Sequence, residues 1–559
     1  MSDVTQSFAA TFVDELAAQG VEFACVSPGS RSAPIAMALQ RHPRIKVLVH
    51  IDERSGSFFA VGLGKATGKP AVVLSTSGTA AAEFHPAVVE AFHSGTPMIV
   101  LTADRPPELQ DVGANQAIDQ QHLFGTAVRW FFDPGVPVEL PNAARFWRRL
   151  AVRAVAESAH GPVHINLPFR EPLVPPPGQV PVAEGAPAQS VTGGRLLPSQ
   201  AQVASLASAL QRSQRPLVIA GAMRDGDRLA AATHRLGLPL LAEPTSQLRR
   251  AEAGPVVESY EALLRAGWSL QHGPDLVIRL GAAPTSRVLN RWLAAAAAPT
   301  FLIDPAHAWR DKDHVATSVM ACDPQPLLEA LPPVDRPAWR EQWVTAGKRA
   351  SAAIAATMVS TPLHEGHVVR ALSARLPNPA QVFVGSSMPI RAADSFWPLT
   401  RQEQRFFANR GASGIDGLVS SGLGVATGRD AAPTVLLLGD LSLYHDMNGL
   451  WALQRHGIRA TIVVCDNNGG GVFSFLPQAE HQDVFEEIFT TPLGLDLSQV
   501  ARLYGLVYSP VSDRSGLEPA IADAIAAPTP TMVVVRMKRE DSVTGHRLCW
   551  EAAASALKS

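Results

Sequence analysis

The sequence predicts an α/β protein built from three doubly wound parallel-sheet domains, of which the first and third are duplicates. Three observations predict this fold class. Short apolar runs alternate with helical patterns along the chain. Segments rich in proline and small residues interrupt the pattern at 173–198 and 331–337, and one glycine-rich heptad occurs twice. We expect domains at residues 1–180, 195–335 and 355–559.

Length and composition limit the class of protein. A chain of 559 residues is too long for one core, and 46% hydrophobic with 18% charged residues is typical of globular domains. The net charge of −2 argues against a nucleic-acid partner. Four cysteines without a CxxC pair give no zinc site and indicate a reducing, cytoplasmic location. The most apolar run, 293–303, is too short to span a bilayer, so we expect no integral membrane segment.

The elements of the first domain follow from apolar periodicity and from the residues that end each run. An amphipathic helix carries Phe8, Phe12 and Leu16 and stops at Gly20. Apolar runs that end in small or polar residues then predict strands at 21–26, 46–50, 71–75 and 98–102. The helical patterns between them begin at residue 33 and cover 55–66 and 80–92.

The middle and third domains repeat this alternation. We predict middle-domain strands at 217–220, 238–242, 276–280 and 301–303. Third-domain strands are predicted at 382–384, 435–438, 461–465 and 532–536, with a crossover helix at 446–456.

The repeated heptad links the first and third domains. Gly62-Leu-Gly-Lys-Ala-Thr-Gly68 precedes the strand at 71, and Gly422-Leu-Gly-Val-Ala-Thr-Gly428 precedes the strand at 435. Because both copies stand before equivalent strands, they indicate two copies of one fold around a divergent middle domain. A dinucleotide fingerprint is the weaker interpretation, since those glycines follow a strand.

Polar residues follow two strands of the third domain at the points where the strands end. Gly439-Asp440-Leu441 follows one strand, and Asp466-Asn467-Asn468-Gly469 follows the next. The carboxyl ends of neighbouring parallel strands meet at one edge of a sheet, where ligands bind. A carboxylate, an amide oxygen and bare carbonyls suit Mg²⁺ carrying a diphosphate. Singly, the Asp is more simply a helix cap and the Asn-Asn-Gly a turn.

This pairing resembles the metal-diphosphate motif of thiamine-diphosphate enzymes, Gly-Asp-Gly followed by Asn-Asn, with Leu441 in place of the second glycine. Such enzymes need a carboxylate that hydrogen-bonds the cofactor's pyrimidine ring and so promotes formation of the thiazolium ylid. Glu53, at the end of a first-domain strand, is the candidate. Alone it would be explained as a first-turn carboxylate stabilised by the helix dipole.

Several arginines stand in loops that face the expected ligand edge, and guanidinium groups are suited to carboxylates. Each one alone is more simply a solvated surface charge. Together they predict a substrate with more than one carboxylate. They are Arg31, Arg105, Arg391 and Arg410, with Arg287 in the middle domain.

A closer resemblance lies in longer stretches of the outer domains. Ser27-Pro-Gly-Ser-Arg-Ser-Ala-Pro34, Thr102-Ala-Asp-Arg-Pro-Pro107 and Asn409-Arg-Gly-Ala-Ser-Gly-Ile-Asp-Gly417 are similar to the 2-succinyl-5-enolpyruvyl-6-hydroxy-3-cyclohexene-1-carboxylate synthases of menaquinone biosynthesis. The resemblance implies decarboxylation of 2-oxoglutarate and 1,4-addition of the succinyl-semialdehyde carbanion to isochorismate. It also implies thiamine diphosphate with Mg²⁺ or Mn²⁺, and a homodimer or dimer of dimers with active sites between subunits.

The resemblance assigns roles to individual residues. The metal ligands are Asp440, Asn467 and the Gly469 carbonyl, with Gly439, Leu441 and Ser387 beside the cofactor and Ile415 supporting its bent conformation. The substrate contacts are Ser30, Arg31, Arg105, Gln116, Arg287, Ser387, Arg391 and Arg410, and the apolar wall is Val472, Phe473 and Leu476. For that wall, ordinary core packing is an equally good explanation of each residue singly.

Two alternatives stay open at this stage. The chain could be another thiamine-diphosphate enzyme, such as a 2-oxoacid decarboxylase or an acetohydroxyacid synthase, although the arginine cluster argues against it. It could also be a catalytically inactive α/β binding protein. The sequence does not decide the quaternary state beyond a dimer, the preferred metal, feedback regulation or the role of the middle domain.

Overall fold

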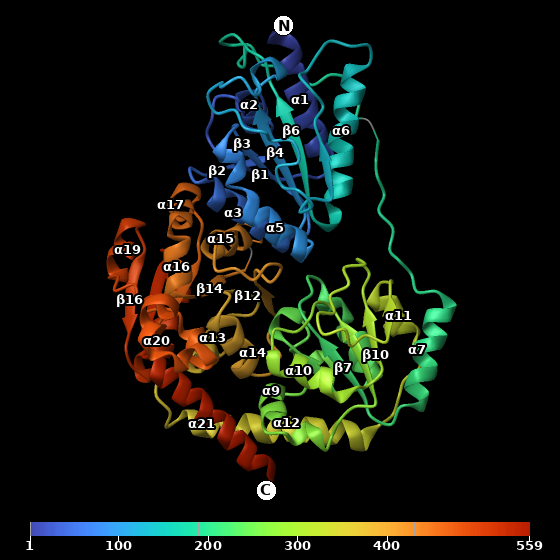
Figure 1. Cartoon of the computed structure of the whole chain (residues 1–559), viewed down its shortest axis with the longest axis vertical. Helices are drawn as coiled ribbons and strands as arrows, with labels where there is room; N and C mark the ends of the chain where they lie inside the picture. Colours follow the sequence, from blue (N-terminus) through green and yellow to red (C-terminus); the bar gives the residue numbers. More distant parts are fainter. Residues whose placement is uncertain (1, 188, 430–431, 559) are drawn as a thin grey trace. The chain divides into compact units, whose positions relative to one another are not determined.

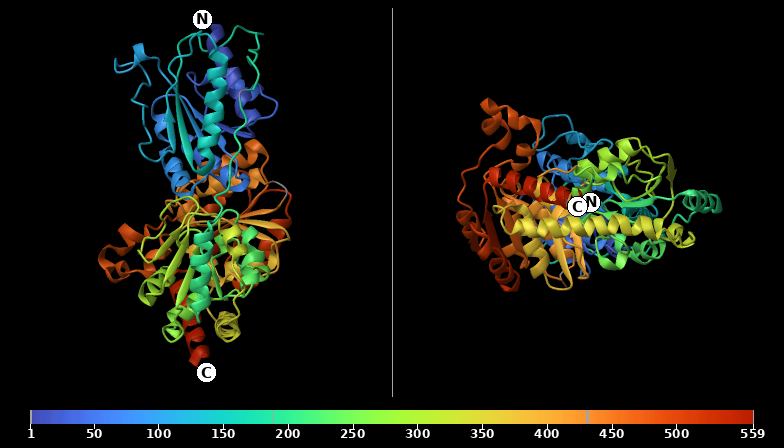
Figure 2. Two further views of the ribbon diagram at one scale, coloured as in Figure 1. Left: turned by 90° about the vertical axis from the view of Figure 1, so that its right-hand side faces the viewer. Right: turned by 90° about the horizontal axis from the view of Figure 1, so that it is seen from below.

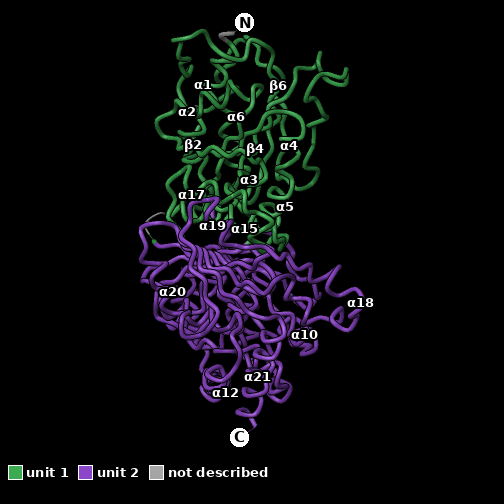
Figure 3. The backbone as a smooth tube through the Cα atoms, turned by 90° about the vertical axis from the view of Figure 1, so that its left-hand side faces the viewer, with its two compact units in different colours: residues 1–193, 409–432, 442–460 green, residues 194–408, 433–441, 461–559 purple. Residues whose placement is uncertain are grey.

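The computed structural model describes residues 2–187, 189–429 and 432–558 and contains three parallel β-sheets with helices packed around them (Figure 1). This confirms the predicted fold class. The chain forms two compact units (Figure 3). Unit 1 comprises residues 1–193, 409–432 and 442–460, and unit 2 comprises residues 194–408, 433–441 and 461–559.

The first sheet belongs to unit 1. Its strands are β1 (Phe23–Val26), β2 (Lys46–Val49), β3 (Ala71–Ser75), β4 (Met98–Asp104), β5 (Trp130–Phe132) and β6 (Pro162–Pro168). They pair in parallel in the order β2-β1-β3-β4-β6-β5. The chain moves outward from β1 to β2 and then returns to the other side of β1. The loops after β1 and β3 therefore stand at a topological switch point, where doubly wound sheets bind ligands.

Helices cover this sheet because its central strands are apolar on both faces. Phe8, Phe12 and Leu16 of α1 pack with Trp147 and Leu150 of α6 in the core on one face. The helices of the first domain are α1 (Ser2–Ala18), α2 (Ala33–Arg41), α3 (Glu53–Thr67), α4 (Thr79–Ala82), α5 (His85–Ser94) and α6 (Ala143–Glu157).

The middle sheet lies in unit 2. Its strands are β7 (Pro216–Ala220), β8 (Leu240–Ala242), β9 (Leu276–Leu280), β10 (Thr300–Ile303) and β11 (Ser318–Met320), in the order β11-β10-β9-β7-β8. The surrounding helices are α7 (Gln200–Arg212), α8 (Ala230–Leu236), α9 (Tyr260–Arg265), α10 (Arg287–Ala296) and α11 (Pro324–Ala330). The long helix α12 (Pro337–Met358) follows and lies beside α21 (Arg539–Lys558) (Figure 2).

The third sheet, also in unit 2, repeats the strand order of the first. Its strands are β12 (Ala380–Val384), β13 (Gln404–Phe407), β14 (Thr434–Gly439), β15 (Thr461–Asp466), β16 (Val507–Val511) and β17 (Thr531–Arg536). The order β13-β12-β14-β15-β17-β16 matches the first sheet strand for strand. The duplication predicted from the heptad is therefore present in the topology. The other helices of unit 2 include α13 (Glu365–Arg375), α14 (Met388–Phe396), α19 (Leu497–Leu503) and α20 (Arg514–Ala526), whereas α15 (Leu418–Gly428) belongs to unit 1.

Two predicted helices are wrong in detail. The helix expected at 80–92 is broken into α4 and α5. The crossover helix expected at 446–456 is broken into the 3₁₀ turn Met447–Leu450 and α17 (Trp451–His456), and the helix α16 (Asp440–His445) precedes them. The break is explained by contacts with α15: the side chain of Asp446 accepts hydrogen bonds from Ser420, and a β-carbon on Gly449 would lie 2.3 Å from the Ser420 hydroxyl.

Candidate functional site

Glu53 is the first residue of α3, and three residues separate it from the end of β2 at Val49. The preceding Asp52 caps the helix, because its carboxylate accepts a hydrogen bond from the Ser55 amide at 3.1 Å. Glu53 is half-buried, and burial raises the pKa of its carboxyl group above the ordinary value, with Asp52 and Glu83 adding to the effect. A carboxyl group with a raised pKa can share a proton with a ring nitrogen near neutral pH.

Two of the predicted arginines lie close enough to interact, Arg31 in the loop after β1 and Arg105 directly after β4. Arg31 is 6% exposed and donates to the carbonyl of Phe169 at 2.8 Å, while Arg105 donates to the hydroxyl of Ser77 at 2.6 Å. Burial and the charge of Arg105 lower the pKa of Arg31. Two guanidinium groups that repel each other form a region where an anionic substrate group is favoured.

A buried amide holds these loops together. Gln120, 1% exposed, accepts from the Gly78 amide at 2.9 Å and donates to Asn166 at 2.9 Å and to the Ala103 carbonyl at 3.2 Å. Gly78 has φ +83°, and a β-carbon there would lie 3.3 Å from the carbonyl oxygen of Gln116. Ser30 and Gln116 are exposed in the same set of loops. The sequence gives no signal that singles out Gln120.

The segment that carries Arg410 and Ile415 also belongs to unit 1. The buried carboxylate of Glu90, on α5, accepts from the amides of Gly411 at 3.0 Å and Ala412 at 2.7 Å. Lys65 pairs with the same carboxylate at 3.0 Å. Both Arg410 and Ile415 are half-buried. Unit 1 therefore brings together Glu53, Ser30, Arg31, Arg105, Gln116, Arg410 and Ile415 in one compact body. Sequence reasoning missed Glu90, whose only signal is a carboxylate within an apolar helix.

In unit 2, Asp440 follows the end of β14 and is 3% exposed. Its carboxylate accepts a hydrogen bond from the Gly469 amide at 2.7 Å. Burial raises the pKa of Asp440 to about 7, although hydrogen bonds from backbone amides oppose the shift. A buried carboxylate without a cation is unfavourable, and a bound divalent ion would compensate it.

The donors around Asp440 fit a hard divalent cation. The side-chain oxygen of Asn467, on the loop after β15, is buried and has no hydrogen-bond partner. A β-carbon on Gly471 would lie 2.3 Å from the side-chain nitrogen of Asn467, so a larger residue there would displace the Asn467 side chain. Gly469 has φ +133°, a conformation that favours glycine. The unpartnered oxygen, the carboxylate and the Gly469 carbonyl are the ligand types that Mg²⁺ prefers.

The remaining predicted residues of unit 2 lie in different places. Ser387 has φ +71° and is the N-cap of α14, and Arg391 donates to its carbonyl at 2.6 Å. Val472 and Phe473 form a 3₁₀ turn after the Asn467 loop, and Phe473 contacts Phe489 with ring centres 5.6 Å apart. Leu476 follows them and is half-buried. Arg287 is exposed at the start of α10, beside the middle sheet rather than at the third sheet.

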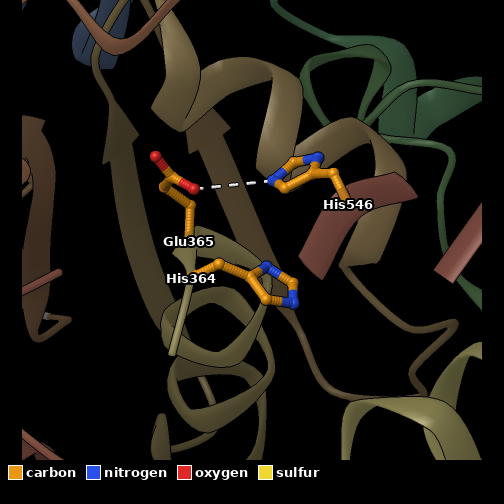
Figure 4. Close-up of side chains that lie close together, drawn as sticks. All are labelled: His364, Glu365 and His546. Atoms are coloured by element: carbon orange, nitrogen blue, oxygen red, sulfur yellow. Dashed lines mark ion pairs between the residues drawn. The ribbon is translucent and has the colours of Figure 1, made fainter. Parts of the chain in front are cut away.

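One further group of metal-ligand types occurs among the residues that the structure describes: His364, Glu365 and His546 (Figure 4). The sequence interpretation does not include it. His364 Nδ1 already accepts the Gly366 amide as the N-cap of α13, at 3.1 Å, so its lone pair is used. Glu365 pairs with His546 at 3.5 Å and accepts from the Ser542 hydroxyl. These contacts explain the cluster as a buried link between α13 and α21.

Three family models match the chain in the order of its sheets. "Thiamine pyrophosphate enzyme, N-terminal TPP binding domain" matches residues 6–123. "Middle domain of thiamine pyrophosphate" matches residues 197–384, and "Thiamine pyrophosphate enzyme, C-terminal TPP binding domain" matches residues 388–535. Among the described residues, no helix is both long enough and apolar enough to cross a membrane.

Curated relatives match the chain along its whole length. A 2-succinyl-5-enolpyruvyl-6-hydroxy-3-cyclohexene-1-carboxylate synthase from Geobacillus kaustophilus is 42% identical, covering 99% of this chain and 99% of the relative. Synthases with the same name from Haloarcula marismortui and Bacillus velezensis are 40% and 39% identical, covering 97% and 100% of this chain and 96% and 99% of the relatives.

Proposed function

Because the chain belongs to the 2-succinyl-5-enolpyruvyl-6-hydroxy-3-cyclohexene-1-carboxylate synthase family of thiamine-diphosphate enzymes, we propose that it is a transferase that decarboxylates 2-oxoglutarate and adds the resulting succinyl-semialdehyde unit to isochorismate. The product is an intermediate of menaquinone biosynthesis. The reaction requires thiamine diphosphate and a divalent cation.

The observation that carries this proposal is the unpartnered side-chain oxygen of Asn467 beside the buried carboxylate of Asp440. A buried oxygen without a hydrogen-bond partner lowers the stability of the folded protein unless a ligand binds it. In our proposal Asp440, Asn467 and the Gly469 carbonyl hold Mg²⁺ or Mn²⁺. Gly439 and Leu441 lie next to Asp440 in sequence and, with Ser387, contact the cofactor.

When bound, thiamine diphosphate supplies a nucleophilic carbon that stabilises the negative charge left by loss of CO₂ from a 2-oxoacid. Glu53 holds a proton on the pyrimidine ring, a role that its raised pKa supports. Ile415 would contact the cofactor from the segment that Glu90 anchors.

The arginines account for dicarboxylate substrates. Arg31 and Arg105 repel each other, although Asp104 and Glu171, which pairs with Arg31 at 3.6 Å, offset part of that repulsion. An anion between the two guanidinium groups would relieve it further. We assign substrate contacts to Ser30, Arg31, Arg105, Gln116, Arg287, Ser387, Arg391 and Arg410, and the apolar wall of the pocket to Val472, Phe473 and Leu476.

The quaternary and cellular arrangement is part of the same proposal. We propose a cytoplasmic homodimer or dimer of dimers in which Glu53 and Asp440 of one site come from different subunits. The domains are proposed as a pyrimidine-binding domain at 1–180, a central domain at 195–335 and a diphosphate-binding domain at 355–559.

The first experiment measures CO₂ release from 2-oxoglutarate with Mg²⁺ and thiamine diphosphate, with and without isochorismate. We expect release that isochorismate accelerates and that removal of the metal by EDTA abolishes. Equal use of pyruvate would instead indicate a 2-oxoacid decarboxylase or an acetohydroxyacid synthase. Cofactor binding without turnover of any 2-oxoacid would indicate a binding protein.

The second experiment tests Glu53. Glu53→Gln should lower kcat by about 100-fold or more, the usual contribution of a positioned proton-transfer group, while calorimetric binding of thiamine diphosphate changes little. Glu83→Gln, at an exposed carboxylate close to Glu53, is the matched control and should retain activity. Normal turnover of Glu53→Gln would remove Glu53 from the mechanism.

A further inference from the structure

Asp446 is a fully buried carboxylate in unit 1 whose partners are all uncharged groups. One carboxylate oxygen accepts from the hydroxyls of Ser55 at 3.0 Å and Ser420 at 3.1 Å. The other accepts from the backbone amide of Ser420 at 2.7 Å. Asp446 lies directly before the 3₁₀ turn Met447–Leu450, outside both helices that it contacts.

The contact with Ser420 is a helix cap supplied from another segment. Ser420 is the third residue of α15, and the N-cap position is Gly417, which has no side chain to accept its amide. Asp446 takes over that function. A β-carbon on Gly417 would lie 1.9 Å from the ring of Phe58, so a capping side chain does not fit at Gly417 itself.

The contact with Ser55 links two helices and does not cap one. Ser55 is the third residue of α3, and its amide is already capped by Asp52. The bond from its hydroxyl to Asp446 therefore adds no cap to α3. It joins the first turn of α3, which begins at Glu53, to the first turn of α15, which follows Ile415 in the chain. A second bond, from the side-chain amide of Asn448 to the Asp52 carboxylate at 3.3 Å, joins the 3₁₀ turn after Asp446 to the start of α3.

We propose that Asp446 is a positioning residue that fixes the start of α3, and with it the Glu53 carboxylate, relative to the segment that carries Ile415. The inference rests on the proposed function, because it depends on the role proposed for Glu53. It assigns Asp446 no contact with cofactor or substrate. A hydrogen-bonded link between two helix starts holds a proton-transfer group in place, and a displacement of about 1 Å can cost about 100-fold in rate.

The test compares Asp446→Asn with wild type. Asn keeps the shape and one acceptor oxygen but cannot accept all three bonds. We expect kcat for CO₂ release from 2-oxoglutarate to fall about 10-fold or more, while KM changes by less than about threefold. In the cofactor-free protein, hydrogen–deuterium exchange should become faster in peptides that cover 53–60 and 418–424 and stay unchanged elsewhere in unit 1.

Ser55→Ala keeps the inference testable if Asp446→Asn is poorly soluble. Ser55→Ala removes only the link to α3 and should lower kcat about threefold or more, and the double variant Ser55→Ala/Asp446→Asn should lose less than the product of the two single effects. Glu365→Gln, at a buried carboxylate that also binds a serine hydroxyl, is the matched control for a structural role and should change thermal stability but not kcat.

Unchanged kcat per folded molecule in Asp446→Asn and Ser55→Ala, with Glu53→Gln inactive, would overturn the positioning role alone. Equally fast exchange throughout unit 1 would also overturn it, because that result indicates a general structural role. If Glu53→Gln itself turns over normally, it is the proposed function of Glu53 that fails.

Discussion

Each copy of the glycine-rich heptad lies at the carboxyl end of a helix. The two helices are alike at this end and differ at their amino ends. The copies are 360 residues apart, 422 minus 62, so Glu53 in the first copy corresponds to Ser413 in the second. In the first copy the helix α3 already begins at Glu53, whereas in the second copy α15 begins at Leu418. The five residues that precede α15 form a loop instead, with φ +64° at Ser413 and +62° at Gly417.

The shared ends of these helices pack against each other through the repeated glycines. A β-carbon on Gly62 would lie 2.0 Å from the Ser421 carbonyl oxygen, and one on Gly424 would lie 2.1 Å from the Phe59 carbonyl oxygen. In both copies the threonine hydroxyl donates to the carbonyl four residues earlier, at 2.8 Å for Thr67 and 2.9 Å for Thr427. Duplication thus preserved the packing surface, while the starts of the two helices diverged to carry different groups.

The largest effect on stability is expected at the glycines where α3 and α15 approach each other closely. Gly424→Ala should lower the midpoint of thermal unfolding by several degrees, because the new methyl group meets backbone that cannot move without separating the helices. The control is Gly516→Ala in α20, where the nearest atom to the added carbon is 3.9 Å away; this variant should be neutral or slightly stabilising. Equal midpoints for the two variants would contradict the close approach of α3 and α15.

The second prediction concerns the one position at which the two heptads differ. Val425 is an apolar residue and fully buried, whereas Lys65 pairs with buried Glu90. Lys65→Met should destabilise the protein by about 2–4 kcal/mol in denaturant unfolding, because Glu90 loses its counter-charge. Lys69→Met, which breaks an exposed pair with Glu22, should cost at most about 1 kcal/mol. Similar losses in the two variants would show that Lys65 does not stabilise the 411–412 anchor.

The last prediction concerns the pH dependence of stability. Burial raises the pKa of Asp446 from 3.8 to about 6, against hydrogen bonds from Ser420 and Ser55 and the nearby charge of Arg54. The folded protein therefore binds a proton between about pH 4 and 6 that the unfolded chain has lost, so this group's contribution to stability falls as pH rises through that window. At neutral pH the cost is about 3 kcal/mol by the usual conversion.

Asp446→Asn lacks this titration. The difference in unfolding midpoint between the variant and wild type should therefore shift in favour of the variant from pH 4.5 to 7. Parallel midpoints across that range would mean that the carboxylate does not titrate as described. If Asp446→Asn is stable but has a lower kcat than wild type, the result would agree with a carboxylate that positions Glu53 rather than stabilising the fold.

Much of the fold could be predicted because strands with long apolar runs and clear turn residues are local features. The ends of β14 and β15 lay within a residue or two of their predicted places. The sequence interpretation does not include the short edge strands β5, β11, β13 and β16, since three to five residues carry little periodicity. It also does not include the seven-residue strand β6, which lies between β4 and β5 in the first sheet. The helix expected at 446–456 was misjudged because a buried contact of Asp446 with α15 overrides its local helical pattern.

The sequence by itself determined the fold class, the duplication and the motif residues Asp440 and Asn467, because these depend on residue types at fixed spacing along the chain. Only the tertiary structure decided that Gln120, Glu90 and Asp446 hold the loops and helix starts in place. Their partners lie far away in sequence, and a buried hydrogen bond between distant segments leaves no periodic trace in either of them.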